Sequence, residues 1–277
     1  MPYAVVVILM SIAVGSVLFH ALSPWWWTPI ASNWRYIDNT MIITFWMTGL
    51  AFVAIVSFMA YCVFCFHHQD GRRAVYEPEN KRLELWLTIA TTVAVAGMLA
   101  PGLFVWKQFV TVPADATEIE VVGQQWQWSY RLPGKDGKLG TSDTRYVGPG
   151  NALGLNPSDP DAQDDIVIED AALHLPVGKP VKVLLRAIDV IHDFYVPHFR
   201  AKMDMIPGSV TYFWITPIRV GTFEALCNEL CGVGHPVMRG TVVVENWSDY
   251  QAWLEKQPTF AQLMDKAKKR RERRPSG

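Results

Sequence analysis

The fold and the chemistry of this chain are both indicated by one stretch near its carboxyl end. That stretch reads Cys227-Asn228-Glu229-Leu230-Cys231-Gly232-Val233-Gly234-His235-Pro236-Val237-Met238. Two thiols, one imidazole and one thioether fall within it, between two β-rich runs. Cys, His and Met donors together form the set that copper prefers over hard cations. The stretch predicts a soft-metal site on a β scaffold.

The number of thiols bears on the number of metal ions. A single-copper electron-transfer site uses one Cys, two His and a weak Met. Two Cys can instead bridge two coppers, and each copper then needs its own imidazole. His192, at the end of the β-rich run 181–190, is the candidate for the second one. A tetrahedral zinc site and a disulfide remain open on this spacing alone.

The scaffold around this stretch is rich in β structure. The β-rich runs are Ile119, Val121, Gln125–Tyr130, Ile166–Ile168, Val181–Leu185, Val210–Ile215 and Thr241–Val244. Gly and Pro turns separate them, which predicts an antiparallel sandwich or small barrel over residues 111–247. Residues 133–165 are rich in Gly, Pro, Asp and Asn, so we expect a long surface excursion.

The last segment, residues 248–277, differs in composition from the β-rich domain. We expect a helix there, with Ser248 as its N-cap, followed by a basic tail from Lys268 to Arg274. A run of this kind is usually a solvated tail. Binding of anionic lipid or of an acidic partner is the alternative.

The amino-terminal 110 residues are typical of a membrane anchor. Three apolar stretches, 3–22, 40–66 and 85–106, are long enough to span a bilayer as helices. The first lacks the Lys or Arg that opens a signal peptide, so we expect it to be retained. Together with the β-rich domain they predict a membrane-anchored all-β protein with three transmembrane helices.

Charged and aromatic residues in the short loops predict the orientation. The loop 67–82 is rich in Lys and Arg and is expected inside, whereas an aromatic belt marks the outer interface. The belt consists of Trp25, Trp26, Trp27, Trp34 and Tyr36. The chain after Trp106 then lies outside, which in a bacterium is the periplasm, and the protein is a multi-pass protein of the inner membrane.

Composition excludes several classes of protein. The chain has 277 residues, of which 50% are hydrophobic and 18% charged, and its formal net charge is −1. Disorder, a fibrous repeat and a basic nucleic-acid binder are excluded.

The charge is unevenly spread: residues 111–247 carry −6 and residues 248–277 carry +4. We therefore expect a partner protein with a Lys-rich surface to be attracted by the acids Asp159, Asp161, Asp164, Asp165, Glu169 and Asp170. Alternatively, these acids solubilise the excursion and the basic tail recruits an acidic partner.

Three sequence blocks in order make the chain resemble subunit II of the haem–copper cytochrome c oxidases over about residues 35–250. The first block is the stretch 227–238, read as Cys-x-Glu-x-Cys-Gly-x-x-His-x-x-Met. The second is Gly123-Gln124-Gln125-Trp126-Gln127-Trp128-Ser129-Tyr130. The third runs from Asp189-Val190-Ile191-His192 through Val196-Pro197, Lys202 and Asp204 to Ile206-Pro207-Gly208. The resemblance implies a transmembrane hairpin followed by a cupredoxin-type β-barrel.

The resemblance also implies a set of functional residues. Two copper ions of a copper A centre would be held by His192, Cys227, Cys231, His235, Met238 and the carbonyl of Glu229. The Glu229 side chain would help hold a magnesium or manganese ion shared with subunit I. Trp126 would take up the electron from cytochrome c, although a core aromatic is the plainer interpretation. Glu84 would lie at the mouth of a proton channel, or else simply stabilise a helix amino terminus.

The implied function is electron transfer from cytochrome c to haem in subunit I, where oxygen reduction is coupled to proton pumping. The implied partners are subunit I, further oxidase subunits, cytochrome c and the lipid bilayer, with no nucleic acid. No Cys-x-x-Cys-His occurs, and Cys62-x-x-Cys65 has its His one position too late, so we expect no haem in this chain. A nitric oxide reductase subunit of the same superfamily and a metal-free, quinol-oxidase-type structural subunit are the alternatives. The third helix, Ser209 after Pro-Gly, and the extra His198 depart from the family pattern.

Overall fold

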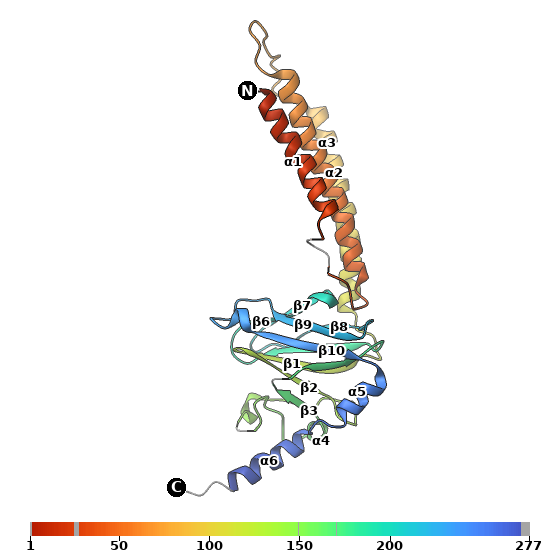
Figure 1. Ribbon diagram of the computed structural model, residues 1–277, viewed down its shortest axis with the longest axis vertical. Helices are drawn as coiled ribbons and strands as arrows, with labels where there is room; N and C mark the ends of the chain where they lie inside the picture. Colours follow the sequence, from red (N-terminus) through yellow and green to blue (C-terminus); the bar gives the residue numbers. More distant parts are fainter. Residues whose placement is uncertain (1, 25–27, 149, 170, 273–277) are drawn as a thin grey trace. The chain divides into compact units, whose positions relative to one another are not determined.

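The computed structural model describes residues 2–24, 28–148, 150–169 and 171–272. The chain divides into two compact units, drawn in Figure 1. One comprises Met1–Thr28 and Tyr36–Lys107, and the other comprises Pro29–Arg35 and Gln108–Gly277. The short segment 29–35, which the sequence places in the anchor, thus belongs to the same unit as the β-rich residues.

The first unit consists of long apolar helices. These are α1 (Pro2–Leu22), α2 (Arg35–Phe66) and α3 (Lys81–Val110), and each is long and apolar enough to cross a membrane. The structure extends α2 and α3 beyond the apolar runs, because a helix continues until its backbone is capped rather than until its apolar residues end. At the start of α3, for example, the Asn80 side chain accepts the Leu83 N–H at 3.0 Å.

The second unit is built on two five-stranded sheets. Their orders are β3-β2-β1-β5-β8 and β4-β10-β9-β6-β7. The strands are β1 (Thr117–Gln124), β2 (Gln127–Leu132), β3 (Ile166–Glu169), β4 (Leu173–Pro176), β5 (Val181–Ala187), β6 (His192–Val196), β7 (Ala201–Met205), β8 (Thr211–Ile215), β9 (Gly221–Cys227) and β10 (Arg239–Glu245). Most strand pairs are antiparallel, as expected, but β1 with β5 and β10 with β4 are parallel. Parallel neighbours need a long crossover, and residues 125–180 supply one between β1 and β5.

The core lies between the inner faces of the two sheets. Along β5, buried and partly exposed residues alternate from Val181 to Ala187, as a strand with one buried face requires. Phe194 of β6 meets the Trp128 ring at 5.2 Å and the Phe213 ring at 6.5 Å across the sandwich. The predicted architecture, three apolar helices followed by a β-sandwich, is confirmed.

The excursion 133–165 is more ordered than its polar composition suggests. It contains a 3₁₀ turn (Thr144–Tyr146) and the short helix α4 (Pro160–Gln163). Its few apolar residues share a buried cluster with Val122 and Phe260. The buried Arg131 of β2 contacts Glu120 and Asp165 at 2.9 Å each. This ion pairing ties the excursion to the sheet.

The carboxyl-terminal segment forms two helices rather than one. Helix α5 (Trp247–Leu254) begins after Asn246, so the expected N-cap at Ser248 is wrong. Asn246 has the extended backbone that an N-cap needs, whereas Ser248 already lies within the helix. Helix α6 (Phe260–Glu272) follows and places Phe260 in the excursion's core. Arg273 and Arg274 of the predicted basic tail lie outside the described residues.

The segment 29–35 adds backbone hydrogen bonds to the β unit. Ala31 N–H donates to His198 O at 2.7 Å, and Asn33 N–H donates to Thr216 O at 3.1 Å. Trp34 is only 1% exposed, and its indole N–H donates to Trp214 O at 2.9 Å. The expected interface belt is therefore wrong for Trp34, because packing in this unit takes the ring out of solvent. Trp25, Trp26 and Trp27 lie outside the described residues.

Candidate metal centre

Neighbouring strands place the predicted donors at one end of the second sheet. His192 is the first residue of β6, and Cys227 is the last residue of the adjacent strand β9. Cys231 lies in the following loop, and Met238 directly precedes β10. The Cys227 N–H donates to the Met238 carbonyl at 3.1 Å, which closes the loop at its base. His192 and Cys227, 35 positions apart in sequence, therefore meet because β6 and β9 are paired.

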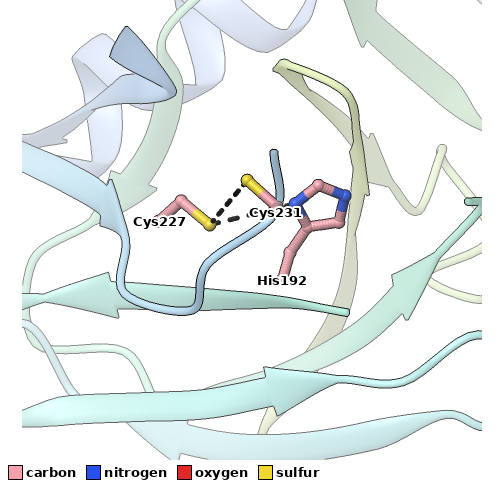
Figure 2. A group of neighbouring side chains, drawn as sticks. All are labelled: His192, Cys227 and Cys231. Carbon is pink, nitrogen blue, oxygen red and sulfur yellow. Dashed lines mark hydrogen bonds between the residues drawn. The ribbon is translucent and has the colours of Figure 1, made fainter. Parts of the chain in front are cut away.

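The donor atoms converge on two sulfur atoms (Figure 2). In Figure 2 dashed lines join Cys227 Sγ to Cys231 Sγ, 3.6 Å away, and to His192 Nδ1, 3.8 Å away. On the other side, Cys231 Sγ lies 3.7 Å from His235 Nδ1 and 3.8 Å from Met238 Sδ. The backbone carbonyl of Glu229 lies 3.2 Å from Cys227 Sγ. Both cysteines are free thiols and both are buried.

This arrangement fits a pair of soft metal ions. Each thiol has its own imidazole and its own weak donor: His192 and the Glu229 carbonyl at Cys227, and His235 and Met238 at Cys231. Ligand atoms of His192, Cys227 and Cys231 lie within 4.8 Å of one another. Thiolate, imidazole and thioether donors select copper over hard cations. The residues present therefore fit the copper pair that the sequence predicts.

Asp189 determines which nitrogen of His192 faces the thiols. Its Oδ1 lies 2.9 Å from His192 Nε2. Burial opposes ionisation of Asp189, but hydrogen bonds from the Gln125 N–H and His192 outweigh it and keep its pKa below the ordinary value. An ionised carboxylate can only accept, so the proton lies on Nε2 and the Nδ1 lone pair faces Cys227.

Opposite pKa shifts at the two thiols show how closely they interact. Burial acts to raise the pKa of Cys227, yet hydrogen bonds from His192 and from backbone N–H groups lower it to about 6. Burial and the neighbouring Cys227 raise the pKa of Cys231 to about 12. Metal ligation requires both thiols as thiolates, and a bound cation removes the repulsion between them.

Trp126 lies at the surface next to this cluster. It is 38% exposed, and its Nε1–H donates to the Cys231 carbonyl at 3.1 Å. The Gln125 side chain donates to the same carbonyl at 2.8 Å. Gly234 lies directly against the indole, since a Cβ there would fall 2.2 Å from Trp126 Cδ2. The metal loop and the aromatic side chain are thus in direct contact.

The remaining predicted residues lie elsewhere. The Glu229 side chain is exposed, while its carbonyl faces Cys227. Glu84 is exposed in the first turn of α3. The His198 ring packs on Phe223, with 5.3 Å between the centroids. Cys62 and Cys65 lie near the end of α2.

The predicted acidic docking cluster is only partly a free surface. Asp165 is fully buried beside Arg131. Asp159 accepts from the Thr141 N–H at 2.8 Å, and Asp164 accepts from the Lys135 N–H at 2.6 Å. These three acids hold the excursion together because their oxygens are the acceptors for its backbone. Glu169 is exposed, and Asp170 lies outside the described residues.

Two residues that contact the metal donors, Asp189 and Gln125, were given no role on the basis of the sequence. Asp189 precedes His192 by three residues, and Gln125 precedes Trp126. The signal available was the Asp close to a predicted ligand His, since ligand imidazoles usually donate their second N–H to a carboxylate. Gln125 had no comparable signal, because the contact with Cys231 joins residues 106 positions apart.

Comparison with known proteins assigns the family. The family described as "Cytochrome C oxidase subunit II, periplasmic domain" matches residues 117–246. The alternative cytochrome c oxidase subunit 2 of Bradyrhizobium diazoefficiens is 69% identical over 260 residues, 94% of this chain and 94% of that protein. Cytochrome c oxidase subunit 2 of Cereibacter sphaeroides is 27% identical over 239 residues, 82% of this chain and 77% of that protein. The periplasmic domain of subunit II of the Bradyrhizobium japonicum cytochrome oxidase shares 29% identity with a TM-score of 0.39, over 58% of this chain and 99% of that one. With near-complete coverage at 69% identity, the chain belongs to the cytochrome c oxidase subunit II family, whose members are subunits of an oxidoreductase complex.

Proposed function

We propose that this chain is the electron-transfer subunit of a cytochrome c oxidase. It takes electrons from cytochrome c at a dinuclear copper A centre and passes them to haem in subunit I, where oxygen reduction is coupled to proton pumping. The observation that carries the proposal is the pair of thiols 3.6 Å apart, each with its own imidazole and weak donor.

The ligands of this centre are the six groups that converge in the structure. His192 and His235 would supply one imidazole each, Cys227 and Cys231 would supply the thiolates, and Met238 and the Glu229 carbonyl would be the weak donors. A copper pair held by these residues would supply a site that shares one electron over two ions, so that little geometry would change on reduction. The chain keeps His192, Cys227, Cys231 and Met238 buried, which excludes water from the donors.

Electron uptake is assigned to Trp126. The ring is exposed to a docking donor, and its N–H bonds to the backbone of Cys231, so the route inward is one hydrogen bond followed by covalent bonds of that residue. Gly234 leaves room for the indole to lie against the metal loop. This contact fixes the ring's place relative to the thiols.

Further partners follow from the family. We assign the exposed Glu229 carboxylate to a magnesium or manganese ion shared with subunit I, and Glu84 to the mouth of a proton channel in subunit I. The three apolar helices anchor the chain in the bacterial inner membrane, with the copper domain in the periplasm and further oxidase subunits around it. We expect no haem in this chain, because its sequence contains no Cys-x-x-Cys-His.

The test is a metal and spectroscopic analysis of the purified oxidase. We expect two coppers per copy of this chain beyond those of subunit I, and an electron paramagnetic resonance signal from one electron shared over two copper nuclei. A localised single-copper signal, or stoichiometric zinc, contradicts the copper assignment. Oxygen consumption with reduced cytochrome c, compared with nitric oxide consumption, separates an oxidase from a nitric oxide reductase.

A further inference from the structure

We propose that Asp189 is a positioning residue for this electron transfer. Its single carboxylate holds both the imidazole of His192 and the turn that carries Trp126. The inference rests on the proposed function, since it assigns Asp189 a role at the same centre.

The two oxygens of Asp189 have different partners. Oδ1 accepts from His192 Nε2 at 2.9 Å and from the Val190 N–H at 2.7 Å. Oδ2 accepts from the Gln125 N–H at 2.7 Å. The carboxylate therefore joins β6 of one sheet to the turn after β1 of the other.

On the His192 side, this contact determines the orientation of a ligand. The ring is completely buried, and the carboxylate that contacts it is that of Asp189. With the proton held on Nε2, the Nδ1 lone pair is directed toward Cys227 Sγ, 3.8 Å away. Loss of such a partner typically reduces metal affinity or activity by about 10- to 100-fold.

On the Trp126 side, the contact fixes the turn that leads to the surface. The Gln125 N–H is held by Asp189, the Gln125 amide donates to the Cys231 carbonyl at 2.8 Å, and Trp126 donates to that carbonyl at 3.1 Å. These contacts close into a ring of touching residues, because Cys231 lies against Cys227 and Cys227 lies against His192. Through this ring of contacts, Asp189 sets the position of the indole relative to both thiols.

The competing explanation is that Asp189 serves only as a docking charge. Its side chain is 30% exposed and negative, so it can attract a basic donor without positioning anything. A docking charge changes donor affinity and salt dependence. A positioning residue changes the copper spectrum and the mobility of the Trp126 turn.

The experiment compares Asp189→Ala, Asp189→Asn and Glu224→Gln in the assembled oxidase. Glu224→Gln is the matched control, because it removes one exposed negative charge from β9, where Glu224 pairs with Arg239 at 2.5 Å.

In Asp189→Ala we expect an altered copper spectrum and a rate of copper reduction by cytochrome c lower by about 10-fold or more, with KM little changed. In Asp189→Asn, the amide oxygen can still accept the hydrogen bond from His192 Nε2. The amide NH₂ group takes the place of the oxygen that accepted from the Gln125 N–H, so that second hydrogen bond is lost. The spectrum should therefore stay close to wild type while the rate falls.

A second readout does not depend on copper. In the metal-free full chain, hydrogen exchange of residues 123–128 should accelerate in both Asp189 variants and remain unchanged in Glu224→Gln. If both Asp189 variants keep the wild-type spectrum and exchange, and only KM rises, the positioning role is wrong and Asp189 is a docking charge. A wild-type oxidase without the shared-electron signal would instead overturn the proposed function, and this inference with it.

Discussion

The indole N–H of Trp126 donates to the backbone carbonyl of Cys231 at 3.1 Å. Trp126 is 38% exposed, whereas Cys231 is 3% exposed, so this hydrogen bond joins the surface of the domain to its buried thiol pair. The two residues lie 105 positions apart in sequence. The first two predictions below test this contact.

Replacing Trp126 by Phe should slow electron uptake from cytochrome c. Phe keeps an aromatic ring but lacks the N–H that anchors it to Cys231, and displacement of a reacting group by about 1 Å can reduce a rate about 100-fold. We expect a decrease of this order in the rate of copper reduction in stopped-flow measurements. KM for cytochrome c and the copper spectrum should be unchanged. An equal loss of affinity and rate would make Trp126 a docking or packing residue instead.

Gly234→Ala should displace the indole without removing a metal donor. The added Cβ would lie 2.2 Å from Trp126 Cδ2, so either the ring or the loop must move. Overpacking of this kind costs about 1–3 kcal/mol. We expect a lower melting temperature of the full chain in detergent and slower electron uptake, with two coppers retained. Gly148→Ala is the control for stability, because a methyl group added at Gly148 would meet nothing within 4 Å and the backbone there has no positive φ.

The two kinds of copper donor should respond differently to substitution. Cys227→Ser should abolish the dinuclear centre, because Cys231 alone cannot supply both bridges. Met238→Leu should retain both coppers and shift the reduction potential, because a thioether is only a weak ligand that tunes it. Copper content and a redox titration of the purified oxidase measure these effects. Retention of the shared-electron signal in Cys227→Ser would contradict the bridging assignment.

Asp165 should make stability depend on pH. Burial raises its pKa to about 7, despite the Arg131 contact, whereas an unfolded Asp titrates near pH 4. The folded state therefore binds more protons in this window, and the free energy of unfolding should fall by on the order of 1 kcal/mol per unit as pH rises from 4 to 7. Asp165→Asn should flatten this dependence of the melting temperature, and Glu169→Gln should not. An unchanged slope in Asp165→Asn would exclude Asp165 as its source.

Oxidation of cytochrome c should slow as ionic strength rises. Residues 111–247 carry a net charge of −6, and salt at 0.1 M screens the attraction between charges more than about 10 Å apart. Neutralising Asp161 and Glu169 should weaken this dependence without removing the acids that hold the excursion. Deleting residues 266–277 should leave it intact. If only the tail deletion weakens it, the donor is acidic and binds the basic tail.

The sequence alone determined the classes of structure in this protein and the chemical nature of its site. Apolar runs of about 20 residues can satisfy their backbone in a bilayer only as helices, so three helices were predictable. The donors from Cys227 to Met238 are close in sequence, and their soft character was predictable from residue type. Local composition misled where packing decides: Trp34 looks like an interface aromatic and is buried, and Asp165 looks like a surface acid and is paired with Arg131.

Only the tertiary structure decided which distant residues meet. Pairing of β6 with β9 brings His192 to Cys227, and the turn after β1 brings Gln125 and Trp126 to Cys231. The carboxylate of Asp189 connects these two contacts. Side-chain periodicity shows which face of a strand is buried, but the register between strands arises from the packing of the whole sandwich. The metal donors could therefore be named from sequence, while the contacts that position them required the fold.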